Sequence, residues 1–150
     1  MDLILWRHAD AHAGEAEAPR ALTGKGRRQA ANIAGWLERH LPDSARIVVS
    51  PAMQAVQTAE ALDRKFKIIA ELAPGAQSAS LLLAADWPDS RQAVVIVGHQ
   101  PALERVASLL LFGVEQDLSM SKGAAWWLTN RSREDEHKVT LRAAMCPDYL

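Results

Sequence analysis

The feature that most constrains the fold of this chain is AVVIV, residues 93–97, an apolar segment with no polar residue at any position. A strand with one face in water alternates apolar and polar residues, so this segment predicts a strand that is covered on both faces. Such strands occur in parallel sheets that carry helices on both faces. The segment therefore predicts an α/β protein.

Strand-like and helix-like segments alternate along the chain, as in βαβ units. Thr23–His40 places its apolar residues on one stripe, which is typical of an amphipathic helix packed on a sheet. Ser50-Pro51 and Gln100-Pro101 predict two more helix starts, with the first residue as N-cap and proline as the first helical residue. A weaker helical pattern covers 78–85. The predicted strands are 3–6, 46–49, 67–70, 93–97, 124–128 and 137–141.

The last two predicted strands enclose a charged turn, NRSREDE, and read as an antiparallel hairpin. We therefore expect a three-layer α/β/α sandwich with a mostly parallel central sheet and an antiparallel edge hairpin. A length of 150 residues fits one domain over residues 1–150.

Composition narrows the classes of partner. With 17 basic and 18 acidic side chains the net charge is -1, so we expect neither nucleic acid nor a membrane surface as a partner. The longest apolar windows are too short for a membrane span. The single Cys146 excludes an internal disulfide framework, and a reducing cytoplasm is the expected location.

Polar residues follow three of the predicted strands at the point where each strand ends. They are Arg7-His8, Ser50-Pro51 and Gly98-His99. The carboxyl ends of parallel strands form the ligand crevice of an open α/β sheet. Two of these segments lead into predicted helix N-termini, which favour anions, and an arginine fork fits phosphate oxygens. The sequence thus predicts an oxyanion pocket that contains two imidazoles.

Four blocks, LWRHADA (5–11), RALT (20–23), VVSPAMQAVQT (48–58) and IVGHQP (96–101), resemble the histidine phosphatase superfamily in order and spacing. The branch they resemble is the small SixA-type phosphohistidine phosphatases. The resemblance implies that His8 is the nucleophile that accepts the phosphoryl group, that Arg7 clamps its oxygens, and that His99 is the second imidazole. It also implies that Arg20, Ser50 and Gln54 lie at the phosphate.

The same resemblance implies a reaction and its partners. The expected substrate is phosphohistidine on a protein, either a phosphotransfer domain or a phosphocarrier protein, and the expected product is inorganic phosphate. No metal and no cofactor is implied. A phosphohistidine leaves as a protonated imidazole and needs no acid for a leaving oxygen. Glu71 and Asp10 are the two carboxylates that remain open as proton donors.

Gln54 departs from the family pattern, which has an arginine at this position. An amide donates hydrogen bonds but brings no charge, and losing one such stabiliser costs on the order of 10²–10³ in rate. Two outcomes stay open. Either another cation, Arg20 or Lys25, fills the gap, or the chain is a catalytically weak or inactive module that binds phosphate or phosphohistidine.

A metallohydrolase is the rival enzyme class. His8, Asp10 and His12 alternate, and in a continuing strand they would share one face that suits zinc. No further cluster of histidine or cysteine supplies more ligands, however, and the Ala/Gly/Glu-rich segment after His12 reads as a loop.

Overall fold

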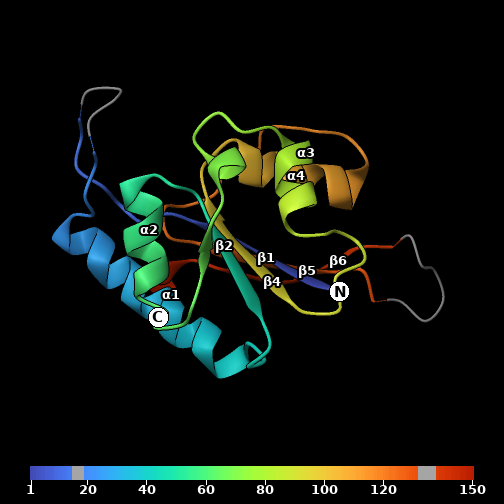
Figure 1. The fold of residues 1–150 in the computed structure, drawn as a ribbon, viewed down its shortest axis with the longest axis horizontal. Coiled ribbons are helices and arrows are strands. Elements are labelled where there is room, and N and C mark those ends of the chain that lie inside the picture. The colour runs from blue at the N-terminus through green and yellow to red at the C-terminus, as the bar shows by residue number, and fades with distance from the viewer. Residues whose placement is uncertain (15–18, 132–137) are drawn as a thin grey trace.

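The computed structural model describes residues 1–14, 19–131 and 138–150. Its centre is a six-stranded sheet in the order β3-β2-β4-β1-β5-β6 (Figure 1). The strands β1 to β4 pair in parallel, whereas β5 pairs antiparallel with β1 and β6 antiparallel with β5. The predicted α/β fold with an antiparallel edge is confirmed. The strands are β1 (Asp2–Arg7), β2 (Arg46–Val49), β3 (Lys67–Ile68), β4 (Val94–Gly98), β5 (Ala125–Thr129) and β6 (Thr140–Met145).

The strand predicted from AVVIV lies inside the sheet. β4 sits between β2 and β1, and all five of its residues are buried. Successive side chains of the neighbouring strand β1 alternate between two cores: Ile4 and Trp6 belong to one, and Leu3 and Leu5 to the other. Burial on both faces explains why the interior positions of β1 and β4 contain no polar residue.

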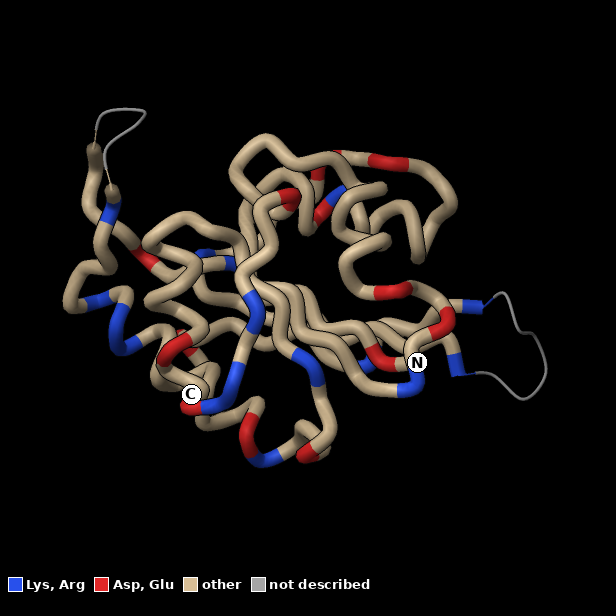
Figure 2. The backbone as a smooth tube through the Cα atoms, viewed as in Figure 1, with Lys and Arg blue, Asp and Glu red and all other residues tan. Residues whose placement is uncertain are grey.

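Helices cover the two faces of the sheet in pairs (Figure 1). α1 (Gly24–His40) and α2 (Met53–Glu60) pack on one face, and α3 (Ser78–Ala84) and α4 (Ala102–Phe112) on the other. Two short 3₁₀ helices, η1 (Ala70–Leu72) and η2 (Pro147–Tyr149), complete the order. Charges of both signs are spread over helices, loops and strand ends (Figure 2). None of the helices in the described ranges is long and apolar enough to cross a membrane.

Two predicted helix starts are wrong. α2 begins at Met53, and its N-cap Ala52 makes no side-chain cap hydrogen bond; α4 begins at Ala102 after Pro101. The physical reason at α2 is that the Ser50 hydroxyl lies 2.7 Å from Nε2 of His99. Thr23, by contrast, caps α1 as the sequence predicts, since its Oγ1 accepts the Gly26 N–H at 2.9 Å.

The last strand is also displaced from its predicted position. β6 runs over Thr140–Met145 instead of 137–141, with most of its residues exposed. It is the outer strand of the sheet, so it lacks the apolar run that marks β4. Residues 132–137, which hold most of the predicted charged turn, lie outside the described residues.

Candidate active site

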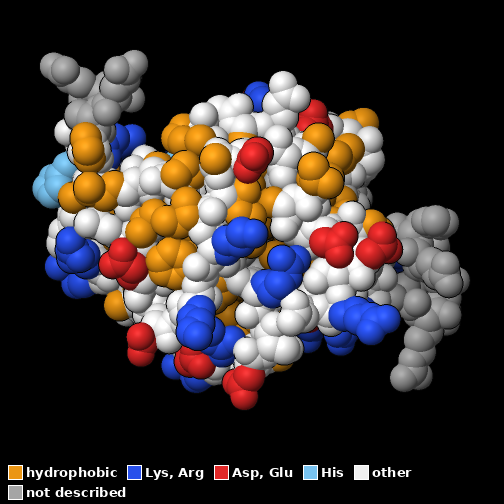
Figure 3. Space-filling model, viewed as in Figure 1, with side chains coloured by type: hydrophobic (Ala, Val, Ile, Leu, Met, Phe, Trp, Pro, Cys, Tyr) orange, Lys and Arg blue, Asp and Glu red, His pale blue; other side chains and the backbone are white. Residues whose placement is uncertain are grey.

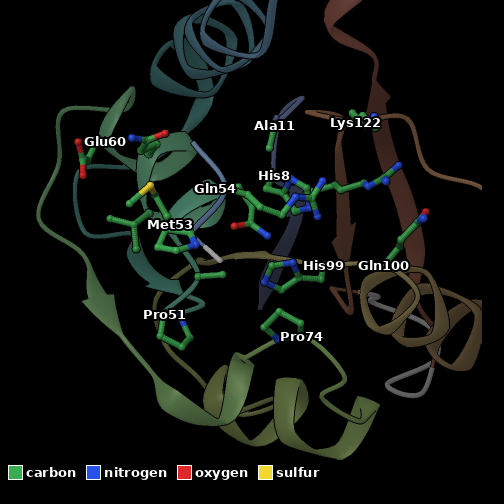
Figure 4. A pocket seen from close by; sticks show the side chains of 16 residues that line it. His8, Ala11, Pro51, Met53, Gln54, Glu60, Pro74, His99, Gln100 and Lys122 are labelled. Atoms are coloured by element: carbon green, nitrogen blue, oxygen red, sulfur yellow. The ribbon is translucent and has the colours of Figure 1, made fainter. Parts of the chain in front are cut away.

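The register of β1 and β4 brings His8 and His99 together. Arg7 and Gly98 are partners in this parallel pair, and each histidine is the next residue along its strand. Neighbouring strands lie about 4.8 Å apart. The two imidazole rings accordingly have centroids 5.1 Å apart. In Figure 4 they face the same hollow as Gln54.

A backbone carbonyl selects the tautomer of His8. Nδ1 lies 2.8 Å from the carbonyl oxygen of Ala9. A carbonyl only accepts hydrogen bonds, so Nδ1 carries the proton and Nε2 of the neutral ring keeps its lone pair. Ala9 is itself tied to α2, because its N–H donates to Oγ1 of Thr58, which donates to the Gln54 carbonyl. Thr58 is therefore a positioning residue that sequence reasoning missed.

Both imidazoles are held in the neutral form. Burial lowers the pKa of His8 below 6.5; the hydrogen bond to Ala9 opposes this shift, and the charges of Arg7, Arg20 and Lys122 add to it. Burial lowers the pKa of His99 to about 4, and repulsion from protonated His8, from Arg20 and from Arg7 adds to this shift. A neutral His8 has the free nitrogen that nucleophilic attack requires.

We expect the free energy of unfolding to fall as the pH is lowered from about 6.5 to about 4. Unfolded His99 takes up a proton near pH 6.5, whereas the folded residue does so only near its pKa of about 4. The unfolded state binds more protons across this window, so acid favours unfolding. Urea unfolding of the native protein and of His99→Gln over this window measures the effect. Parallel pH profiles for the two proteins would contradict it.

Ser50 supports His99 and does not line the pocket. The family resemblance implies that Ser50 lies at the phosphate, but the residue is fully buried and its hydroxyl bonds to Nε2 of His99. The same oxygen accepts the N–H of Ala52 at 3.2 Å. Ser50 therefore fixes the orientation of the His99 ring from the end of β2.

Arg7 is held through the peptide of Met120. Its Nη1 donates to the Met120 carbonyl. Glu104 on α4 is close enough to Arg7 to feel its charge; the side chain is 2% exposed, and its Oε1 has no hydrogen-bond partner among the described residues. Burial raises the pKa of Glu104, and its own backbone N–H, the charge of Arg7 and the Met120 N–H oppose the shift. No sequence signal distinguishes Glu104 from any other charged residue on an amphipathic helix.

Removing the Glu104 side chain should loosen this arrangement. Glu104→Ala leaves a cavity in place of a side chain that is 2% exposed, and we expect it to lower the free energy of unfolding by about 2–4 kcal/mol. Glu104→Gln keeps the shape and an acceptor oxygen, so it should cost less than half as much. Urea unfolding of the three proteins tests this. If the alanine and glutamine variants are equally stable, the packing of the Glu104 side chain does not stabilise this part of the site.

A pocket of about 970 Å³ opens at these side chains, large enough for far more than a phosphate ion. Gln54, 6% exposed, contributes its wall from the first turn of α2. Arg20 and Lys25 are the two cations expected to replace the arginine missing at position 54. Arg20 lines the pocket, and Lys25 does not. The carboxylate among the described residues that line the pocket is Glu60. Glu71 and Asp10, the two candidate proton donors, do not line it. The main polar lining residues are Arg7, His8, Arg20, Gln54, Gln57, Glu60, His99, Gln100 and Lys122.

The residues proposed for zinc do not share a strand face. β1 ends at Arg7, before His8, and the Asp10 carboxylate bonds to Thr23 and Lys122. Within residues 1–14, 19–131 and 138–150, no group of three or more histidine, cysteine or acidic side chains is arranged to hold a metal ion.

Fold and pocket together define a class. A mostly parallel sheet with an antiparallel edge, and two histidines after adjacent parallel strands, is the histidine phosphatase fold. The family model of the histidine phosphatase superfamily (branch 1) matches residues 3–78, just over half of the chain. The chain belongs to this superfamily. Comparison with curated proteins gave no significant match.

Solved structures with this fold include SixA proteins. The protein histidine phosphatase SixA complexed with tungstate is 25% identical over 99% of both chains, with a TM-score of 0.78. SixA from Agrobacterium tumefaciens is 25% identical over 97% of this chain and 98% of its own, with a TM-score of 0.78. A phosphoserine phosphatase from Entamoeba histolytica shares the fold, with a TM-score of 0.72. It is 17% identical over 99% of this chain and 98% of its own.

Proposed function

We propose that this protein is a phosphohistidine phosphatase that hydrolyses phosphohistidine on a partner protein through a phospho-His8 intermediate, without a metal. One observation carries the proposal: two neutral imidazoles with ring centroids 5.1 Å apart lie beside Arg7 at the carboxyl ends of adjacent strands. The similarity to a SixA that binds tungstate, a tetrahedral oxyanion shaped like phosphate, supports it.

The reaction has two displacements at phosphorus. In the first, the lone pair on Nε2 of His8 attacks phosphorus and the bond to the substrate imidazole breaks. In the second, water attacks the phosphorus of phospho-His8, the bond to Nε2 breaks, and inorganic phosphate leaves. The guanidinium of Arg7 stabilises the charge on the equatorial oxygens in both steps.

A protein-borne substrate agrees with the surface around the pocket. Met53 lines the pocket and is 40% exposed, and hydrophobic side chains gather over α2 on the face seen in Figure 3. An apolar rim suits contact with a folded domain that presents a phosphohistidine. A phosphotransfer domain or a phosphocarrier protein is the class of partner that meets this requirement.

Gln54 favours a second candidate, a module that binds phosphate or phosphohistidine with little or no turnover. The buried amide brings no charge to the first turn of α2. Vanadate and phosphate should raise the melting temperature in either case, since both functions require an oxyanion site.

Turnover separates the two candidates. The test measures phosphate release from a phosphohistidine protein, from phosphoramidate and from a simple phosphoester. We expect release from the first two and much slower release from the ester. Protection by vanadate without release from any compound would favour the binding module. Release from the ester alone would overturn the proposed substrate class.

A further inference from the structure

The loop before β5 brings a positive charge to the pocket that no sequence motif marks. Lys122 lines the pocket with Arg7 and Arg20. In Figure 4 it lies across the hollow from Met53 and Glu60 of α2. The ammonium of Lys122 therefore approaches the hollow from the loop before β5, whereas a side chain at position 54 approaches it from α2.

The backbone at Lys122 is fixed against the end of β1. The N–H of Gly123 donates to the carbonyl of His8 at 3.1 Å, and the Arg7 N–H donates to Ala124 at 3.0 Å. Gly123 has a φ of 77°, and a Cβ there would lie 3.2 Å from side-chain atoms of Gln29 and Pro147. Glycine permits this approach. The residue that follows Lys122 is thus hydrogen-bonded to the His8 carbonyl, which keeps Lys122 close to His8.

The side chain of Lys122 is also held. Its Nζ lies 3.0 Å from Oδ1 of Asp10, and the other oxygen of Asp10 accepts from Oγ1 of Thr23 at 2.7 Å. An ammonium has three N–H donors, so two remain after the contact with Asp10. The side chain is 49% exposed, which leaves those donors accessible. The charge of Lys122 also lowers the pKa of His8, which agrees with its closeness to that ring.

We propose that Lys122 binds the phosphoryl group in this pocket and supplies the positive charge that the family pattern places at position 54. The proposal rests on the proposed function, which puts a tetrahedral oxyanion beside His8. Gln54 donates from its amide on one wall, and the ammonium balances the charge of the oxyanion from another. Asp10 and Thr23 act as positioning residues that keep Lys122 at the pocket.

The first test measures binding of inorganic phosphate and vanadate by calorimetry. We expect Lys122→Met to weaken binding about 10- to 100-fold, because it removes a charge-assisted hydrogen bond, and Lys122→Arg to keep most of the affinity. Lys65→Met is the matched control: it removes the same charge from an exposed lysine that does not line the pocket. It should leave binding unchanged. Thermal melting shows whether each variant is folded.

The second test is a double-mutant cycle with Gln54→Arg. If Lys122 replaces the missing arginine, Gln54→Arg should restore about 10-fold or more of the lost affinity in Lys122→Met and improve the native protein much less. A merely structural role for Lys122 predicts the same factor in both backgrounds. Turnover of phosphohistidine in the same four proteins should follow the affinities.

The outcomes distinguish the two proposals. If the native protein binds phosphate and Lys122→Met binds it equally well, the assignment of Lys122 is wrong while the proposed function stands. Equal effects of Gln54→Arg in both backgrounds would also overturn it. If the native protein binds neither phosphate nor vanadate, both the proposed function and the role of Lys122 are wrong.

Discussion

Replacing His8 with glutamine should abolish turnover of phosphohistidine, with a loss on the order of 10³-fold or more, as expected when a nucleophile is removed. The hydrogen bond to Ala9 leaves Nε2 as the free nitrogen, and glutamine offers no nucleophilic nitrogen. The native protein incubated with a radiolabelled phosphohistidine protein should retain acid-labile label, and His8→Gln should retain none. Label that remains on the variant would place the nucleophile elsewhere.

His12→Gln is the matched control for this experiment. His12 is exposed and follows His8 by four residues. In the proposed reaction its side chain has no role, so turnover should not change. The metal alternative predicts the opposite, because His12 would then be one of the zinc ligands. Loss of activity in both variants, with equimolar bound metal in the native protein, would revive that alternative.

Gly26→Ala should be the most destabilising methyl addition in the first turn of α1. A Cβ at Gly26 would lie 1.9 Å from the backbone oxygen of Asp10 and 2.9 Å from its carbonyl carbon. Backbone atoms cannot swing away as a side chain does, so the loop after β1 must shift. We expect the free energy of unfolding to fall by about 3 kcal/mol or more, at the upper end of overpacking costs. Phosphate binding should weaken as well, because the same loop carries the Asp10 contact to Lys122.

Gly35→Ala is the control in the same helix. Nothing lies within 4 Å of a Cβ at Gly35, and the residue is exposed. Alanine should therefore stabilise the protein by about 0.5–1 kcal/mol through helix propensity alone. Urea unfolding of both variants gives the comparison. A Gly26→Ala variant as stable as the native protein would show that α1 does not pack against the loop after β1 as described.

The fold followed from the sequence because its signals are local. An apolar run without alternation indicates burial on both faces, and β4 occupies the interior of the sheet as that rule requires. β6, an exposed edge strand, has no such run and was misplaced by several residues. The Ser50-Pro51 helix start was also wrong, because a cap pattern does not reveal that the serine hydroxyl bonds to a histidine 49 residues away.

The pairing of Arg7 and His8 with His99 was predictable from the sequence, because residues at the carboxyl ends of adjacent parallel strands meet at one edge of a sheet. Only the tertiary structure revealed the contacts of Thr58, Glu104 and Lys122. Thr58 and Lys122 bond to residues 49 and 112 positions away, and Glu104 is buried near the charge of Arg7; no shared sequence pattern links these segments. Periodicity and motif spacing reveal only interactions between residues that are close in the sequence. The order of strands in the sheet decides which distant loop faces the pocket.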